Sequence, residues 1–344
     1  MSHASTTATR NTQTRTYLRR LLAPALISLS LLAPLQIAHA NVNLTFQQVL
    51  QEERAWAGLQ SKTLKVNNIE WSYSIGGQAN KPTILLIHGL SGSRDNWNRV
   101  ARYLTPHYQV IIPDLPFHGD TKAPADFDPQ IANFQEELRK LMGELGVHQN
   151  LHVAGHSLGG GIGLLYASIY FTETQSLMIM NSAGVYKNTN SAYLKDPNKR
   201  REMVVSKTGD LDRSLKIAMH TPPFIPSALK REQEQLMIAQ APQTSKVINK
   251  LIEQAGHYTP DSFALPVRSI EAPTLIIWGD KDQVIDVGVV PELVEHLKNE
   301  EPPVILKGIG HSPLLEAEQL VIQHYLPFLQ KAQAKPNPFA GATN

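Results

Sequence analysis

One serine of this chain lies between glycines in a pattern typical of nucleophilic catalysis. The segment is Gly155-His156-Ser157-Leu158-Gly159, and it joins the apolar run 151–155 to the helix-like run 162–171. A G-x-S-x-G segment between a strand and a helix makes a sharp turn that exposes the serine hydroxyl. Glycine is favoured beside that turn because a side chain would collide with neighbouring elements. Ser157 is therefore the candidate nucleophile.

A serine hydroxyl reacts near neutral pH only if a base takes its proton and an acid orients that base. His311 lies in GIGHSPLLE, after an apolar run, and offers the base. Asp280 and Asp282 lie in WGDKDQVID, after another apolar run, and both are candidate acids. Along the chain the serine comes first, the acid second and the histidine third. This is the order found in hydrolases whose serine lies on a turn between a strand and a helix. The residues alone predict a triad of Ser157, His311 and one of these aspartates.

Other polar residues suggest less chemistry. His152 and His156 are four residues apart, a metal-binding spacing on a helix, but a strand followed by a turn gives them no shared face, so no zinc site is expected. Asp114 and His118 are expected to fix a loop beside the site. Asn181 ends the run 176–181, and an amide cannot act as the anionic partner of the base.

The elements around these residues alternate between strand and helix. A capping box from Thr45 to Gln48 predicts a helix through about residue 57, and a helical pattern over 131–145 ends at Gly146. This alternation predicts an α/β fold with a mostly parallel sheet and helices on both faces. The predicted strands are 69–75, 83–87, 109–113, 151–155, 176–181, 273–279 and 303–307.

One stretch interrupts the alternation. Between about residues 186 and 267 no strand is evident, and three short helical patterns begin near Asp210, Ser227 and Gln243. Helices inserted between two core strands predict a helical cap over the C-terminal ends of the strands, where pockets of α/β folds lie. The expected domains are a core of residues 41–185 and 268–332, a cap of residues 186–267 and a disordered tail of residues 333–344.

The N-terminus predicts export. Four arginines precede the apolar run 21–38, and Ala38-His39-Ala40 fits a cleavage site, so residues 1–40 are expected to be a signal peptide of a secreted or periplasmic protein. A retained membrane anchor is the alternative, which Pro24 and Pro34 disfavour. Removing those four of the 32 basic residues leaves 28 against 30 acidic ones, a net charge of −2. This balance argues against nucleic acid as a partner. Cysteine is absent, which excludes disulfides and thiolate chemistry.

Five segments together resemble the α/β-hydrolase superfamily, and within it the bacterial family V lipases and the α/β-hydrolase-domain monoacylglycerol lipases. They are LLIHGLSGSRDNW, PDLPFHGDT, GHSLGG, PTLIIWGDKDQVIDV and GIGHSPLLE, and the likeness spans about residues 66–330. The resemblance implies an α/β-hydrolase fold without cofactor or metal. It also implies Ser157 as nucleophile, Asp282 rather than Asp280 as acid, and His311 as base. The oxyanion donors would be the backbone N–H groups of Leu90 and Leu158.

The function expected from this reading is an exported serine hydrolase that cleaves carboxylic esters, with acylglycerols as the leading substrates and possible contact with lipid surfaces. Most apolar residues of the cap are expected to form its own small core and to pack on the sheet. If some of them, such as Phe224, line the approach to Ser157 instead, the site is an apolar slot suited to an acyl chain. The same triad would also suit a C–C bond hydrolase, a peptidase or a thioesterase. A hydrolase-like binding module is disfavoured because all three triad residues are present. A dehalogenase or epoxide hydrolase would require an aspartate in place of Ser157.

Overall fold

A computed structural model describes residues 44–335 and 337–339 of the chain. The described residues fall into two units with the boundary between residues 49 and 50, and helix α4 (Phe46–Trp56) crosses this boundary. The predicted capping box opens this helix, since Gln48 N–H donates to Thr45 Oγ1 and Thr45 N–H to Gln48 Oε1. The expected signal peptide, residues 1–40, lies outside the described residues. Within the part of the chain that is described, no helix has the length and apolar character needed to span a membrane.

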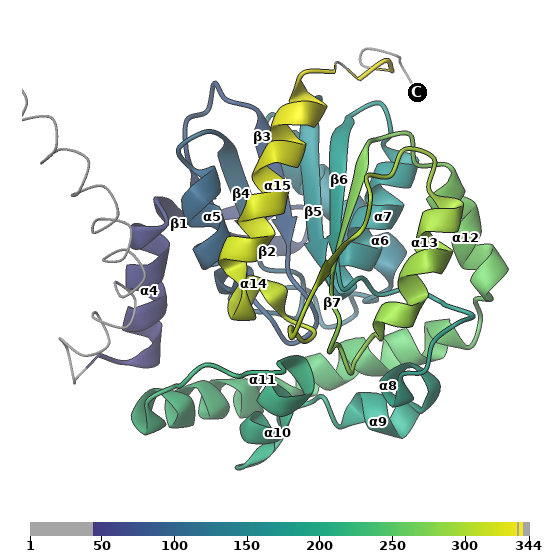
Figure 1. Cartoon of the computed structure of the whole chain (residues 1–344). Helices are drawn as coiled ribbons and strands as arrows, with labels where there is room; N and C mark the ends of the chain where they lie inside the picture. The colour runs from purple at the N-terminus through teal and green to yellow at the C-terminus, as the bar shows by residue number, and fades with distance from the viewer. Residues whose placement is uncertain (1–43, 336, 340–344) are drawn as a thin grey trace, which may run out of the picture. The chain divides into compact units, whose positions relative to one another are not determined.

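The second unit is built on an eight-stranded sheet with the strand order β1-β2-β4-β3-β5-β6-β7-β8 (Figure 1). The pairs β1·β2 and β2·β4 are antiparallel, and every other neighbouring pair is parallel. The expected mostly parallel sheet is therefore confirmed. The strands are β1 (Leu59–Val66), β2 (Ile69–Gly76), β3 (Thr83–Ile87), β4 (Gln109–Pro113), β5 (Leu151–His156), β6 (Thr174–Met180), β7 (Thr274–Gly279) and β8 (Val304–Leu306).

Central strands are apolar on both faces because helices cover both sides of the sheet. Along β3, Leu85 and Ile87 belong to one buried cluster, while Ile84 and Leu86 belong to the other. One face is covered by α5 (Asn98–Leu104), α14 (Pro313–Glu316) and α15 (Glu318–Gln333). The other face is covered by α6 (Ile131–Glu144), α7 (Leu158–Ile169), α12 (Pro260–Arg268) and α13 (Val290–His296). Two short 3₁₀ helices, η1 (Arg94–Trp97) and η2 (Val287–Val289), complete the core.

The insertion between β6 and β7 is helical, as expected, but its helices differ from the prediction. It contains α8 (Ala192–Lys195), α9 (Pro197–Arg201), α10 (Asp210–Ala218) and α11 (Ser227–Ala255), which gather at one end of the strands (Figure 1). The patterns beginning near Ser227 and Gln243 form one continuous helix, α11, although Pro242 lies inside it. A proline there removes one backbone hydrogen bond, and the helix continues across that gap. Helix α12 packs on α7 and α13, so the end of the predicted cap range belongs to the core.

Two further features differ from the prediction. Strand β1 was not expected, because five of its six interior residues are exposed and its sequence shows no apolar alternation. The expected disordered tail of residues 333–344 begins within α15, and Asn337 in that segment is anchored. Its side-chain amide donates to the carbonyls of Phe171 and Thr174, at 2.9 and 3.1 Å. The Phe339 ring lies 5.4 Å from that of Phe171. Residues 337–339 therefore pack on the loop before β6.

Candidate active site

Ser157 occupies the turn between β5 and α7 in a strained backbone conformation. Its φ of 53° and ψ of −118° lie outside the backbone regions that residues other than glycine usually adopt. The flanking glycines make the turn possible. A Cβ on Gly155 would lie 2.0 Å from Gly159 O, and one on Gly159 would lie 2.2 Å from Ile87 O. Only residues without a side chain fit where α7 crosses so close to the ends of β3 and β5.

His311 lies between Ser157 and an aspartate. Its Nε2 is 2.9 Å from Ser157 Oγ, and its Nδ1 is 2.8 Å from Asp282 Oδ2. A carboxylate can only accept a hydrogen bond, so Nδ1 carries the proton and Nε2 presents its lone pair to the serine hydroxyl. All three side chains are buried. The loops after β5, β7 and β8 thus bring the three predicted residues into one hydrogen-bonded row.

The structure separates the two candidate acids. Asp282 Oδ1 accepts the N–H groups of Val284 and Ile285, and its Oδ2 also accepts the side-chain amide of Asn181 at 2.7 Å. Asp280 instead accepts the backbone N–H of Gly308 at 2.7 Å. Asp282 is therefore the aspartate that contacts His311. Asp280 instead holds the loop after β8, which carries His311, through Gly308. The donation from Asn181 was not foreseen, although its position at the end of β6 was the available signal.

The loop after β3 adjoins the candidate nucleophile. A Cβ on Gly89 would lie 3.0 Å from Ser157 Cβ. His88 fixes this loop: its Nε2 accepts Leu115 N–H at 2.9 Å, so its Nδ1 carries the proton and donates to Gly89 O at 2.8 Å. Because N–H and C=O of one trans peptide point in opposite directions, holding Gly89 O also fixes the direction of Leu90 N–H. Leu158, the second expected donor, is the first residue of α7.

Two other histidines near the site, His152 and His156, are buried and hydrogen-bonded to neighbouring residues. His156 Nε2–H donates to His311 O at 2.7 Å, and burial lowers the pKa of His156 to about 3. His152 bonds Ser176 Oγ at 2.7 Å, and burial lowers its pKa to about 4. His156 was not foreseen as a contact of the His311 loop. Within the described ranges, no group of three or more potential ligands lies together in a way that would hold a metal ion.

Asp114 and His118 belong to the loop that follows β4, beside the site. Asp114 accepts the backbone N–H of Arg94 at 2.7 Å and that of Asp120 at 2.9 Å, and it pairs with the Arg94 guanidinium. Burial nevertheless raises the pKa of Asp114 to about 6. His118 packs its ring 5.1 Å from that of His88, and burial lowers the pKa of His118 to about 4. Both residues contact loop groups, as expected, rather than Ser157 or His311.

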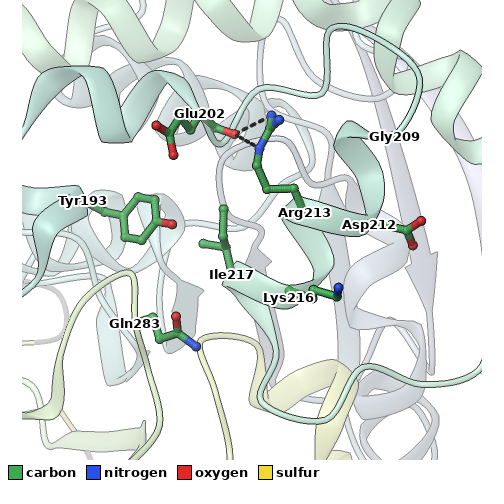
Figure 2. A pocket seen from close by; sticks show the side chains of 8 residues that line it. All are labelled: Tyr193, Glu202, Gly209, Asp212, Arg213, Lys216, Ile217 and Gln283. Carbon is green, nitrogen blue, oxygen red and sulfur yellow. Dashed lines mark hydrogen bonds between the residues drawn. The ribbon is translucent and has the colours of Figure 1, made fainter.

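A cavity of about 430 Å³ lies in the cap (Figure 2). Most of the residues that line it are polar, and Ile217 is the aliphatic residue of the lining. Gln283 contributes from the core, directly after Asp282. The Arg213 side chain points toward Glu202 and donates to its backbone carbonyl (Figure 2). None of the three residues of the hydrogen-bonded row lines this cavity, so it is separate from the candidate active site.

The fold is that of the α/β hydrolases, and comparison with known proteins agrees. The chain belongs to the alpha/beta hydrolase fold family, whose model matches residues 82–318. It is similar to Lipase 1 of Psychrobacter immobilis, with 30% identity over 92% of this chain and 99% of that protein.

Two crystal structures are also similar to this chain. One is a candidate lipase from Acinetobacter baumannii, with 55% identity, a TM-score of 0.84, and coverage of 85% of this chain and 98% of that one. The other is a membrane phospholipase A, with 31% identity, a TM-score of 0.79, and coverage of 94% and 100%.

Proposed function

We propose that this chain is an exported serine hydrolase of acylglycerols that works through Ser157, His311 and Asp282. The coarser class, a carboxylic ester hydrolase of the lipase and esterase type, follows from its family and its lipase relatives. The single observation that carries the finer proposal is the row Asp282···His311···Ser157, with bonds of 2.8 and 2.9 Å. A base within hydrogen-bond reach of a serine, oriented by a buried carboxylate, is the arrangement that activates a hydroxyl.

The reaction proceeds in two halves. His311 Nε2 takes the proton of Ser157 as Oγ attacks the ester carbonyl carbon. The tetrahedral intermediate collapses, the bond to the alcohol oxygen breaks, and His311 returns the proton to the leaving alcohol. Water then enters, loses a proton to His311 and attacks the acyl carbon of the acyl-enzyme. The second tetrahedral intermediate collapses, the bond between the acyl carbon and Ser157 Oγ breaks, and His311 returns the proton to Oγ, which releases the acid and restores Ser157. Asp282 holds Nδ1–H throughout and stabilises the positive charge on the imidazole between steps.

Backbone N–H groups stabilise the negative oxygen of each tetrahedral intermediate. Leu158 N–H stands at the start of α7, where the helix dipole favours a negative charge. Leu90 N–H lies in the loop that His88 holds beside Ser157. Losing one such donor typically slows a reaction by about a hundredfold to a thousandfold. The side chains of both leucines are unimportant for this role.

The substrate part of the proposal is supported by the lipase relatives. Several apolar cap residues are buried and serve the packing of the cap itself: Val204, Val205, Leu211, Ile217, Met219, Val247 and Ile248. Phe224 departs from the expectation. It is 82% exposed, and therefore does not line an acyl slot. Export is supported by the arginines and the Ala38-His39-Ala40 pattern in the first 40 residues.

The test is hydrolysis by the purified chain of monoacylglycerols and of p-nitrophenyl esters from acetate to palmitate, without added metal. We expect faster turnover of medium or long acyl chains than of acetate, because each buried methylene adds up to about 0.8 kcal/mol of binding. A fluorophosphonate should label the chain at Ser157. An optimum at acetate with no turnover of any acylglycerol would overturn the substrate assignment, and an unlabelled Ser157 would overturn the mechanism.

Phospholipid esters are a second candidate substrate, because a membrane phospholipase A is 31% identical over nearly the whole chain. Phosphatidylcholine vesicles belong in the same assay. Release of fatty acid from these vesicles faster than from monoacylglycerol would favour this assignment. The likeness to meta-cleavage product hydrolases, at 19% identity, shows the fold alone and gives no support to C–C bond cleavage.

A further inference from the structure

Glu316, the last residue of α14, contacts the His311 loop and the cap at the same time. Its Oε1 accepts the backbone N–H of Gly310 at 2.8 Å. Its Oε2 accepts the backbone N–H of Thr221 at 2.9 Å. Gly310 is the residue before His311, and Thr221 lies in the cap between α10 and α11. One carboxylate therefore joins a loop of the core to a loop of the cap, with one oxygen for each.

The cap backbone also lies directly against Gly310. A Cβ on Gly310 would lie 2.6 Å from His220 N and 3.0 Å from Met219 C. On the other side, a Cβ on Gly279, at the end of β7, would lie 2.2 Å from Gly310 O. The residue before the base is thus enclosed between the core sheet and the cap. Because the cap backbone at Met219 and His220 lies against Gly310, a displacement of the cap at Met219 to Thr221 would also shift the residue next to His311.

We propose that Glu316 is a positioning residue that couples the location of the cap to the alignment of His311. The inference rests on the proposed role of His311 as the base. With the cap seated, both oxygens are bound, and Gly310 is fixed at the geometry that places the imidazole against Ser157 and Asp282. When the cap loop moves away, the carboxylate loses one of its two anchors and holds Gly310 less firmly.

The two acceptors of a carboxylate suit this task, because an amide offers only one oxygen and would present a donor to the second N–H. Hydrogen bonds to a charged acceptor are stronger than neutral ones, so two of them fix both loops. His156 fixes the other side of the same loop, through His311 O. The base is therefore held by the nucleophile turn on one side and through Glu316 on the other.

The first test is a kinetic cycle of Glu316→Ala and Thr221→Pro, which removes the backbone donor, with Thr221→Ala as the comparison that keeps it. We expect Glu316→Ala to lower kcat on p-nitrophenyl acetate about tenfold with little change in KM, since a misaligned base slows chemistry. Glu316→Gln should lose less. Thr221→Pro should lower kcat in the parent chain but add little in the Glu316→Ala chain, because coupled residues are not additive. Glu318→Gln is the matched control for lost charge.

Amide hydrogen exchange of the unmodified chain gives a second readout that needs no activity. We expect Gly310 and Thr221 N–H to exchange slowly and at similar rates, and Glu316→Gln to accelerate exchange at Thr221 and Gly310 while amides in the sheet keep their rates. Unchanged kcat for Glu316→Ala, additive effects in the cycle, or independent exchange of the two amides would each overturn the coupling. A parent chain without ester hydrolysis would overturn the proposed function instead, and the exchange result would still decide whether the link exists.

Discussion

At the scale of single residues, the candidate site is defined by which atoms can donate. Asp282 accepts a hydrogen bond from His311 Nδ1, so in the neutral imidazole the lone pair of Nε2 faces Ser157. Asp282 in turn is oriented by Asn181 and by two backbone N–H groups. The hydrogen bonds that orient Asp282 and His311 are thus already formed before a substrate binds. The chemistry proposed here needs little rearrangement of the protein at the reacting atoms.

Replacing the nucleophile tests the row most directly. Ser157→Ala should lower kcat by about 10⁴ to 10⁶, because nucleophile and base act as a unit. The fold should persist, since alanine keeps the Cβ that the strained turn already accommodates. Ester hydrolysis and circular dichroism of the purified variant measure the two effects. A variant that keeps more than about a tenth of the activity would show that Ser157 is not the nucleophile.

Replacing each aspartate by asparagine tests the choice of acid. Asp282→Asn should lower kcat about 10⁴-fold, because the amide no longer holds the proton on Nδ1. Asp280→Asn should change kcat less than about fivefold, since an amide oxygen can still accept Gly308 N–H. The matched pair differs only in which carboxylate faces the imidazole. If the larger loss follows Asp280→Asn, the acid has been misassigned.

At the scale of elements, the sequence predicted those strands whose residues are buried and apolar. Seven of the eight strands were found because apolar runs mark strands covered on both faces, whereas β1 has mainly exposed residues between its ends and carries no such mark. The site residues were predicted because each follows a buried strand at one edge of the sheet. Contacts across the fold were not predictable from local pattern. Glu316 and Asn181 act through partners 95 and 101 residues away, which only the folded chain brings together.

Cap residues of different exposure should respond differently to truncation. Phe224→Ala is expected to leave the acyl-chain preference unchanged on soluble esters and to change the free energy of unfolding by about 0.5 kcal/mol or less, because the ring is 82% exposed. Ile217→Ala removes a buried side chain from the cluster that includes Leu85 and Ile87, and it should lower the free energy of unfolding by about 2 to 5 kcal/mol. Urea unfolding of each variant measures the free energy of unfolding, and a series of p-nitrophenyl esters of increasing acyl length measures the chain preference. A flattened preference in Phe224→Ala would place that ring in the substrate path.

At the scale of the whole molecule, several histidines are buried in the neutral form. Burial lowers the pKa of His118 and His152 to about 4 and that of His156 to about 3, and it also lowers the pKa of His88. In an unfolded chain these imidazoles would titrate near 6.5. Below that pH the unfolded chain binds protons that the folded chain refuses, so the histidines favour unfolding in acid.

Stability should therefore fall steeply between about pH 6.5 and pH 4. Each such histidine contributes about 1.4 kcal/mol per pH unit in this window, and the raised pKa of Asp114, about 6, offsets one of them because that carboxyl binds a proton in the folded state. Urea unfolding at pH 7, 6 and 5 measures the slope. His152→Asn should reduce the number of protons taken up on unfolding by about one, because burial lowers the pKa of His152 to about 4. A flat profile would contradict neutral burial.

The row of Ser157, His311 and Asp282 also has a consequence for the order in which the chain becomes active during synthesis. Ser157 and His311 are 154 residues apart, and the proposed base follows β8, the last strand of the sheet along the chain. A growing chain that has already formed the turn at Ser157 still has no group to accept the serine proton. Hydrolytic competence then arises late, after β7 and β8 have paired. A chain cleaved or stalled before β8 would carry Ser157 without the proposed base and, by the proposed mechanism, would not hydrolyse esters.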